Sequence, residues 1–363
     1  MLSTGVLARI LLGLSLLQGV LIYVPLPTWP LWLAHFAATE TCLIACVTGA
    51  LAFSLASTPT ERGLAVIGIA AGLLPALWVA PLYLREGVRF SPLSWLGWEH
   101  AAAVDIRRDV EVAPGLLADI YGGVGGSPRP AIVIVHGGSW RAGDKGDAPH
   151  VSIALASAGY VVFDIRYRLA PEYPFPAGLS DVKCAVGGIR ENAAAFGVDG
   201  GRIALLGRSA GANLALVAAY SGEFAKSCAG DTSVAAVISI YGPTDLAWSH
   251  DHPFVPDVVD GTAAIEVYLG GAPTEKEEQY RQASPQSWLD APVPPTLLIH
   301  GTGERCVRPE NMEKLASALL LRGISPRVLR IPLADHGFDI RRGGLGEQLS
   351  RSVILDFLAQ HLQ

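Results

Sequence analysis

The sequence predicts an α/β fold, in which helices cover both faces of a mostly parallel sheet, preceded by about three transmembrane helices. Two observations lead to this prediction. Of the 27 basic and 33 acidic residues, only six lie within residues 1–88, where their charges cancel, so residues 89–363 hold the whole net charge of −6. From about residue 100, short β-branched runs alternate with alanine-rich stretches, which is the pattern of strands joined by helices. We therefore expect a membrane anchor at 1–88 and a second domain at 89–363.

The anchor contains three apolar stretches, Ile10–Val24, Leu31–Ser57 and Gly63–Leu84. The last two are long enough to cross a hydrocarbon core, which takes about 20 residues. The first reaches that length only if Leu2–Ala8 are included and Arg9 extends its charge to the interface. A cleaved signal peptide is the alternative, but no small-residue cleavage site follows the first stretch, and two more apolar stretches come after it. The sequence therefore predicts a multi-pass membrane protein in contact with lipid.

The connection between the first two stretches is rich in proline. The segment Pro25–Pro30 cannot continue a helix, and Trp29 and Trp32 stand where interfacial aromatic residues are expected. These residues predict a turn at the membrane surface.

The orientation of the anchor is nearly balanced by charge. Arg9 and Arg62 flank one side of a three-span topology, and Arg85 and Arg89 flank the other. The amino terminus favours an N-in arrangement, which places the second domain outside the cytoplasm. An odd number of cysteines lies in that domain, and they predict no disulfide framework. These cysteines are Cys184, Cys228 and Cys306.

The second domain alternates predicted strands and helices. Six apolar runs read as strands buried on both faces: residues 131–135, 160–164, 203–206, 235–240, 296–299 and 327–331. The helix candidates between them are residues 148–158, 178–196, 210–220 and 309–322. Residues 242–291 interrupt this alternation and are rich in Asp, Pro and Trp. We expect them to form a cap insertion over the carboxyl edge of the sheet, where ligands bind in such folds.

A candidate nucleophile lies between one of these strands and the next helix. The segment Gly207–Gly211 reads G-x-S-x-G, with Ser209 at its centre. A sharp turn from strand to helix needs glycines where side chains would clash, and it raises the serine hydroxyl above the sheet. The amino end of the following helix points its amides at the same place, which suits a developing oxyanion.

A second glycine motif, His136–Trp140, directly follows the predicted strand at 131–135. Two successive glycines let backbone N–H groups approach a substrate oxygen without obstruction. The amides of Gly137 and Gly138, together with that of Ala210, are candidate oxyanion-hole donors. A simple glycine turn is the alternative reading.

A serine nucleophile requires a base and an acid that orients the base. His336 follows the strand at 327–331 and is the candidate base. Glu304 opens the loop after the strand at 296–299 and is the candidate acid. The alternatives for the acid are Asp245, Asp335 and Asp339.

These motifs together resemble the α/β-hydrolase superfamily, and within it the hormone-sensitive-lipase-like esterases and small carboxylesterases. The resemblance covers about residues 104–360 and leaves the membrane segments out. Besides the segments above, it includes Asp164–Glu172, Phe175–Ala177, Asp181, Phe196–Asp199, Arg202–Ile203, Tyr241–Asp245, His300–Gly301 and His336–Phe338. Two positions depart from the usual pattern. Ser139 replaces a third glycine, as in feruloyl-esterase-like and arylformamidase-like relatives, and Glu304 replaces the usual aspartate.

The resemblance implies an α/β-hydrolase fold and a carboxylesterase that acts through an acyl-enzyme. It implies Ser209 as nucleophile, His336 as base, and Gly137, Gly138 and Ala210 as oxyanion donors, with no metal or organic cofactor. Alternative substrates are a specialised amide, an acetyl ester or a membrane lipid. A further alternative is a non-catalytic, membrane-anchored binding protein of the same fold. Because the domain is acidic and has no basic stripe, nucleic acid is not expected as a partner.

Overall fold

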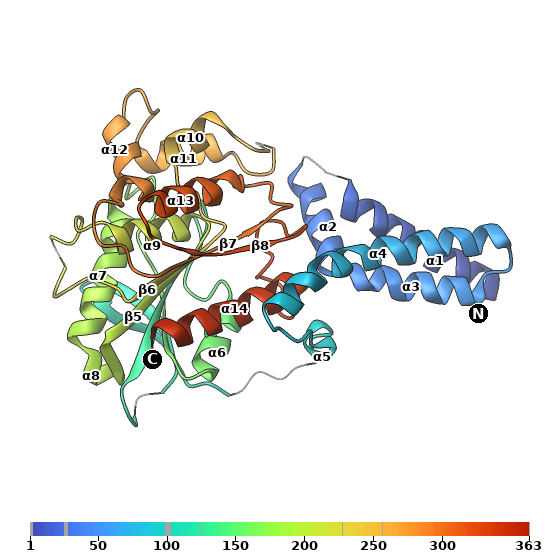
Figure 1. The fold of residues 1–363 in the computed structure, drawn as a ribbon, viewed down its shortest axis with the longest axis horizontal. Coiled ribbons are helices and arrows are strands. Elements are labelled where there is room, and N and C mark those ends of the chain that lie inside the picture. The colour runs from blue at the N-terminus through green and yellow to red at the C-terminus, as the bar shows by residue number, and fades with distance from the viewer. Residues whose placement is uncertain are drawn as a thin grey trace.

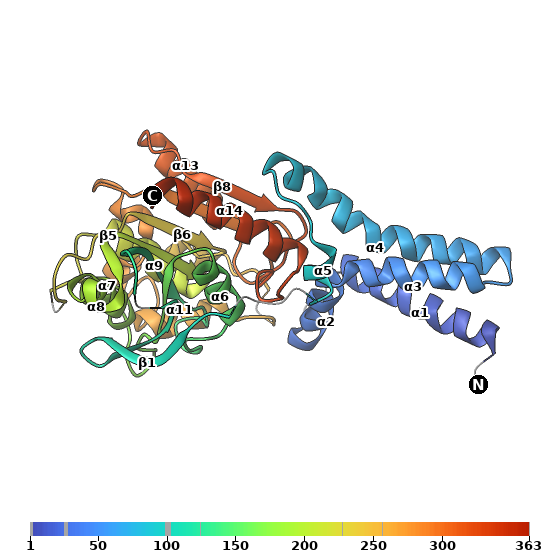
Figure 2. The ribbon, with the colours of Figure 1, turned by 90° about the horizontal axis from the view of Figure 1, so that it is seen from below.

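The computed structural model describes residues 3–24, 28–98, 103–123, 125–226, 228–255 and 257–362. An elongated helical bundle projects from a larger unit built around one sheet (Figures 1 and 2). Within the predicted turn at Pro25–Pro30, residues Pro25–Pro27 lie outside the described residues. Leu2 of the first predicted span lies outside them as well.

The bundle consists of α1 (Thr4–Tyr23), α2 (Trp29–Glu40), α3 (Cys42–Leu55) and α4 (Pro59–Arg85). Small residues form its interior contacts, and Gly68 and Gly72 leave no room for a Cβ against Ser15 of α1 and Cys42 of α3. Large apolar side chains point outward instead, which is the arrangement of helices packed in lipid. They include Leu14, Leu17 and Val20 on α1, Val47 and Leu51 on α3, and Val66, Ile67 and Leu77 on α4.

Helices α1 and α4 are each long and apolar enough to cross a membrane. The predicted span Leu31–Ser57 is divided at Thr41 into α2 and α3, which are bent by 70° relative to each other. The side-chain amide of Gln18 donates to the carbonyl of Thr41 (2.8 Å) and to that of Ala38 (3.3 Å), so backbone groups at the break are satisfied within the protein. By length and composition, the described residues therefore hold two helices that could cross a membrane, or three such segments if the bent pair counts as one.

A short helix, α5 (Pro92–Trp95), follows the bundle, and the sheet comes next. The eight strands are β1 (Ile106–Ala113), β2 (Leu116–Tyr121), β3 (Arg129–Val135), β4 (Val161–Ile165), β5 (Val198–Arg208), β6 (Ala236–Ile240), β7 (Thr296–Gly301) and β8 (Arg327–Ile331). Their order in the sheet is β1-β2-β4-β3-β5-β6-β7-β8. The β1–β2 and β2–β4 pairs are antiparallel, and all other pairs are parallel. The predicted fold class is confirmed.

Helices cover both faces of the sheet (Figure 1). The covering helices are α6 (Pro149–Ser157), α7 (Ala177–Glu191), α8 (Ala193–Phe196), α9 (Ala210–Tyr220), α13 (Glu310–Leu321) and α14 (Leu345–His361). Alternate residues of the central strands enter opposite cores: Val133 packs with α7 and α9, whereas Ile132 and Ile134 pack with α6 and α14. Both faces of each strand are therefore apolar, which explains the continuous apolar runs in the sequence.

Residues 242–291 form α10 (Leu246–Asp251), α11 (Gly261–Leu269), α12 (Glu277–Gln282) and the 3₁₀ turn η1 (Pro285–Trp288) between β6 and β7. A disulfide links Cys184 of α7 to Cys228. The odd number of cysteines in this part of the sequence concealed the pair, because Cys306 remains a free thiol.

Candidate active site

Ser209 occupies the turn from β5 to α9 with a strained backbone. Its φ of 51° and ψ of −123° lie outside the regions that non-glycine residues ordinarily occupy. The flanking glycines are required by close packing: a Cβ on Gly207 would collide with the start of α9, and a Cβ on Gly211 would collide with the carbonyls of Val135 and His136. The G-x-S-x-G spacing is thus explained by the packing of α9 against β3 and β5.

His336 lies between Ser209 and Glu304, which reach it from separate loops. Its Nε2 is 3.0 Å from Oγ of Ser209, and its Nδ1 is 2.8 Å from Oε2 of Glu304. The loop after β8 supplies His336, and the loop after β7 supplies Glu304. This chain of two hydrogen bonds joins the three residues that the sequence predicts as nucleophile, base and acid.

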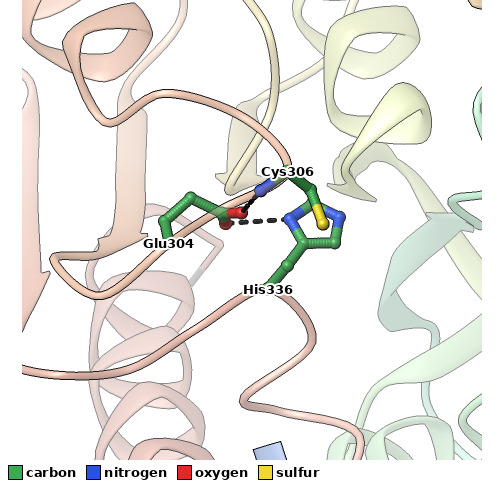
Figure 3. Close-up of side chains that lie close together, drawn as sticks. All are labelled: Glu304, Cys306 and His336. Atoms are coloured by element: carbon green, nitrogen blue, oxygen red, sulfur yellow. Dashed lines mark hydrogen bonds and ion pairs between the residues drawn. The ribbon is translucent and has the colours of Figure 1, made fainter. Parts of the chain in front are cut away.

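Glu304 is held by backbone groups as well as by His336. Its Oε1 accepts the N–H groups of Cys306 (2.7 Å) and Val307 (3.1 Å), while its other oxygen faces the imidazole. Figure 3 shows the carboxylate joined both to the ring of His336 and to the backbone of Cys306. Glutamate has the reach to make all three contacts from this position in the loop.

The other acid candidates from the sequence are engaged elsewhere. Asp245 caps α10 through the N–H of Trp248 (3.0 Å) and pairs with Lys314 (2.9 Å). Asp339 accepts the hydroxyl of Tyr241 (2.5 Å) and pairs with Arg208 (2.6 Å). None of these contacts is to His336. Of the three alternative acids from the sequence, this leaves Asp335.

Asp335 precedes His336 and binds Arg305 rather than the imidazole. Its Oδ1 accepts the backbone N–H groups of His336 (2.7 Å) and Arg305 (3.0 Å), and its Oδ2 accepts Nε and Nη2 of the Arg305 guanidinium (2.8 and 2.7 Å). Because Arg305 follows Glu304 in the chain, this pair joins the loop of Glu304 to the loop of His336.

The charges at this site oppose the effects of burial. Burial raises the pKa of Glu304, but the charge on His336 and the hydrogen bonds to the carboxylate outweigh it and hold that pKa below its ordinary value. Burial lowers the pKa of His336, but the Glu304 carboxylate outweighs it and raises that pKa above the ordinary value. The pair therefore favours a charged acid beside an imidazole that readily accepts a proton.

The predicted oxyanion donors lie around Ser209. Ala210 is the first residue of α9, where a backbone N–H has no acceptor within the helix. Gly137 passes so close to the nucleophile turn that a Cβ there would lie 3.3 Å from Cβ of Ser209. Gly138 has a φ of +113°, and a Cβ on it would collide with the carbonyl of Ala142. All three residues line one cavity together with Ser209 and His336.

The departure at Ser139 is accommodated without a third glycine. Ser139 and Trp140 both have positive φ values, 54° and 57°. The ring of Trp140 is stacked on Tyr268 with 4.6 Å between centroids, and the ring of His136 is stacked on Tyr167 at 4.2 Å. Residues on both sides of the two glycines are therefore held by ring stacking, which packs this loop against Tyr167 and Tyr268.

Within the described residues, Glu304, Cys306 and His336 also form a candidate metal-binding group, with one ligand atom of each within 4.8 Å of the others. Both ring nitrogens of His336 are already within hydrogen-bonding distance of Glu304 and Ser209. Burial and the nearby Glu304 and Asp335 charges raise the pKa of the Cys306 thiol, which disfavours the thiolate that a metal requires. The donor set therefore fits hydrogen-bonded acid–base chemistry better than metal coordination.

The cavity over Ser209 has a volume of about 360 Å³ and is lined by three separate parts of the chain. The sheet loops supply Ser209 and the glycines. The insertion at 242–291 supplies apolar side chains, among them Phe254, Val259 and Ile265. Helix α2 supplies Trp29 and Trp32. Sequence reasoning did not find the contributions of Arg305 and Trp32, because no motif marks either one.

Comparisons with known proteins identify what the chain is similar to. The family model BD-FAE matches residues 118–319. Esterase LipC of Mycobacterium tuberculosis is 33% identical over 245 residues, which cover 64% of this chain and 59% of LipC. Carboxylesterase NlhH of the same organism is 30% identical over 220 residues, covering 58% of this chain and 66% of NlhH. The chain thus spans less than two thirds of the length of these relatives.

Solved structures show the same fold. A truncated carbohydrate esterase from gut microbiota superposes with a TM-score of 0.61 at 24% identity, covering 72% of this chain and 98% of that one. Esterase 2 of Thermogutta terrifontis, phosphonylated by sarin, superposes with a TM-score of 0.60 at 23% identity, covering 72% of this chain and 96% of that one.

Proposed function

Because the chain belongs to the BD-FAE family of α/β-hydrolases, we propose that it is a membrane-anchored serine carboxylesterase. The observation that carries the proposal is the chain of hydrogen bonds from Glu304 through His336 to Ser209, at 2.8 and 3.0 Å, at the base of a cavity. The relatives named esterase and carboxylesterase support the same reaction class. The substrate is a carboxylic ester of small-molecule or lipid type.

The reaction begins with attack by Oγ of Ser209 on the ester carbonyl carbon, while Nε2 of His336 accepts the hydroxyl proton. Glu304 stabilises the resulting imidazolium and fixes the orientation of the ring. The N–H groups of Gly137, Gly138 and Ala210 stabilise the negative charge on the former carbonyl oxygen. His336 then donates its proton to the departing alkoxide, and water hydrolyses the acyl-enzyme by the same steps.

Residues 1–88 serve as the anchor and residues 89–363 as the catalytic domain, with 242–291 as a cap. The outward-facing apolar side chains of α1, α3 and α4 support insertion into lipid. The Cys184–Cys228 disulfide favours an oxidising compartment for the catalytic domain, in agreement with the N-in arrangement that the amino terminus favours. Labelling of single cysteines from either side of intact cells tests this topology.

Replacement of the nucleophile tests the reaction directly. Ser209→Ala should abolish hydrolysis of short p-nitrophenyl esters. The rate should fall by at least about 10⁴-fold, as it does when a triad residue is removed from other serine hydrolases. It should also abolish labelling by a fluorophosphonate probe. Ser157→Ala is the matched control, because Ser157 is exposed on α6. Retention of full activity by Ser209→Ala would overturn the proposal.

A further inference from the structure

Helix α2 of the anchor forms part of the wall of the substrate cavity. Trp29 and Trp32 are stacked on each other, with 4.9 Å between ring centroids, and both line the cavity that contains Ser209. Figure 2 shows α2 at the junction between the long bundle and the catalytic domain. The cavity is therefore incomplete without the anchor.

The position of α2 is fixed by contacts with a catalytic loop. Nε1 of Trp32 donates a hydrogen bond of 2.8 Å to Oδ2 of Asp335, which directly precedes His336. His35 lies between the two units, with Nε2 3.7 Å from Oδ2 of Asp335 and Nδ1 2.8 Å from the carbonyl of Leu21 on α1. Because Trp32 and Asp335 are both buried, these contacts hold α2 against the active site.

Other parts of the cavity lining are apolar as well. Phe254, Val259 and Ile265 come from the insertion, and Ile340 comes from the loop after His336. The side chain of Ile340 is 56% exposed, and that of Trp29 is 47% exposed. Both residues therefore belong to the cavity and to the molecular surface, so they lie at its rim.

This rim is next to the membrane-facing part of the protein. Helix α1, whose outer face is apolar, ends at Tyr23, and α2 begins six positions later at Trp29. An ester with a long apolar chain is concentrated in the bilayer that surrounds α1 and α4, whereas a short soluble ester gains nothing from this arrangement.

We propose that the substrate is a membrane-resident lipid ester whose acyl chain reaches Ser209 between the Trp29–Trp32 pair and the apolar insertion. This inference rests on the proposed esterase function and adds the substrate class and the route of entry. Trp29 is then a specificity-determining residue that contacts the chain rather than the reacting carbonyl.

The test uses the full-length chain reconstituted in phosphatidylcholine vesicles. We expect kcat/KM for p-nitrophenyl esters to rise from the acetyl to the dodecanoyl ester. In Trp29→Ala the ratio of the dodecanoyl to the acetyl value should fall by about tenfold, as expected when an apolar wall loses contact with a few methylenes. Trp98→Ala is the matched control, because Trp98 is 67% exposed and does not line the cavity.

Two experimental outcomes distinguish failure of this inference from failure of the esterase function. If a small fluorophosphonate labels Ser209 but the wild-type protein prefers the acetyl ester, or the ratio is the same in Trp29→Ala, the lipid inference is overturned and the esterase function stands. If Ser209 is not labelled and no ester is hydrolysed, the esterase function itself fails, and the inference fails with it. If the dodecanoyl-to-acetyl ratio falls as much in Trp98→Ala as in Trp29→Ala, the inference is also overturned, because the effect is then not specific to a residue that lines the cavity.

Discussion

Arg305 binds Asp335 through its backbone N–H at 3.0 Å and through two guanidinium nitrogens at 2.7 and 2.8 Å. Both side chains are buried, at 9% and 1% exposure. Because Glu304 precedes Arg305 and His336 follows Asp335, this ion pair joins the loop of Glu304 to the loop of His336. The predictions below follow from this pair, from the triad, from the nucleophile turn and from the disulfide.

Asp335→Asn should destabilise the protein by about 3–5 kcal/mol, because it removes the charged acceptor of two hydrogen bonds from the buried Arg305 guanidinium. Denaturant unfolding of the detergent-solubilised protein measures the change. The matched control is Asp290→Asn, since Asp290 is 92% exposed and meets Arg322 at 3.3 Å, so no measurable change is expected there. Equal effects of the two substitutions would contradict the role assigned to the buried pair.

The pH profile of kcat/KM should have its acid limb above pH 6.5. Activity requires neutral His336, so it is present above the pKa of that group and lost as pH falls through it. Glu304 raises this pKa above its ordinary value. In Glu304→Gln the charge is gone and burial dominates, so the limb should move to lower pH while the plateau falls by roughly 10²–10⁴-fold. Initial rates between pH 5 and 9 give both quantities.

Glu304→Asp is the companion variant, because it keeps the charge but shortens the side chain. Its acid limb should remain above that of Glu304→Gln, while its plateau falls through misplacement of the carboxylate by about one methylene. If the limbs of the wild type and of Glu304→Gln coincide, Glu304 does not control the protonation of His336.

Gly211→Ala should destabilise the protein by at least about 3 kcal/mol and abolish activity, because the added Cβ meets the carbonyls of Val135 and His136. The melting temperature and the fluorophosphonate labelling report the two effects. Gly222→Ala is the control: a Cβ there meets nothing within 4 Å, so stability and labelling should be retained. Wild-type behaviour of Gly211→Ala would show that α9 does not pack as described.

Thiol titration of the denatured protein should detect three thiols without reductant and five after reduction, because Cys184 and Cys228 are paired while Cys42, Cys46 and Cys306 are free. The double substitution of the pair by serine should cost about 2–4 kcal/mol of stability, because the unfolded chain loses a constraint. Cys46→Ser should lower both thiol counts by one. Five thiols before reduction would exclude the disulfide.

Much of the sheet was predictable from sequence, and the failure to predict its edge strand has a physical reason. The six predicted strands correspond to β3–β8, whose apolar residues enter both cores, although the edge strand β8 also carries the exposed Arg330. Strands β1 and β2 were not predicted. Strand β1 forms the sheet edge, and its charged residues Arg107, Arg108, Asp109 and Glu111 hide the apolar signal. The predicted helix 178–196 is broken at Asn192, where α7 ends and α8 begins.

The sequence by itself determined the division into an apolar helical part and an α/β domain, because strands buried on both faces and long helices with apolar outer faces each demand a continuous apolar run. It also identified Ser209, Glu304 and His336 as candidates, because each follows an apolar strand that can be recognised from its own short stretch of sequence. Only the tertiary structure decided what Trp32 does. The sequence predicted an interfacial tryptophan, but the 70° bend at Thr41 turns α2 onto the catalytic loops, where Trp32 binds Asp335 at 2.8 Å. Such a contact joins residues 303 positions apart, and no local pattern records it.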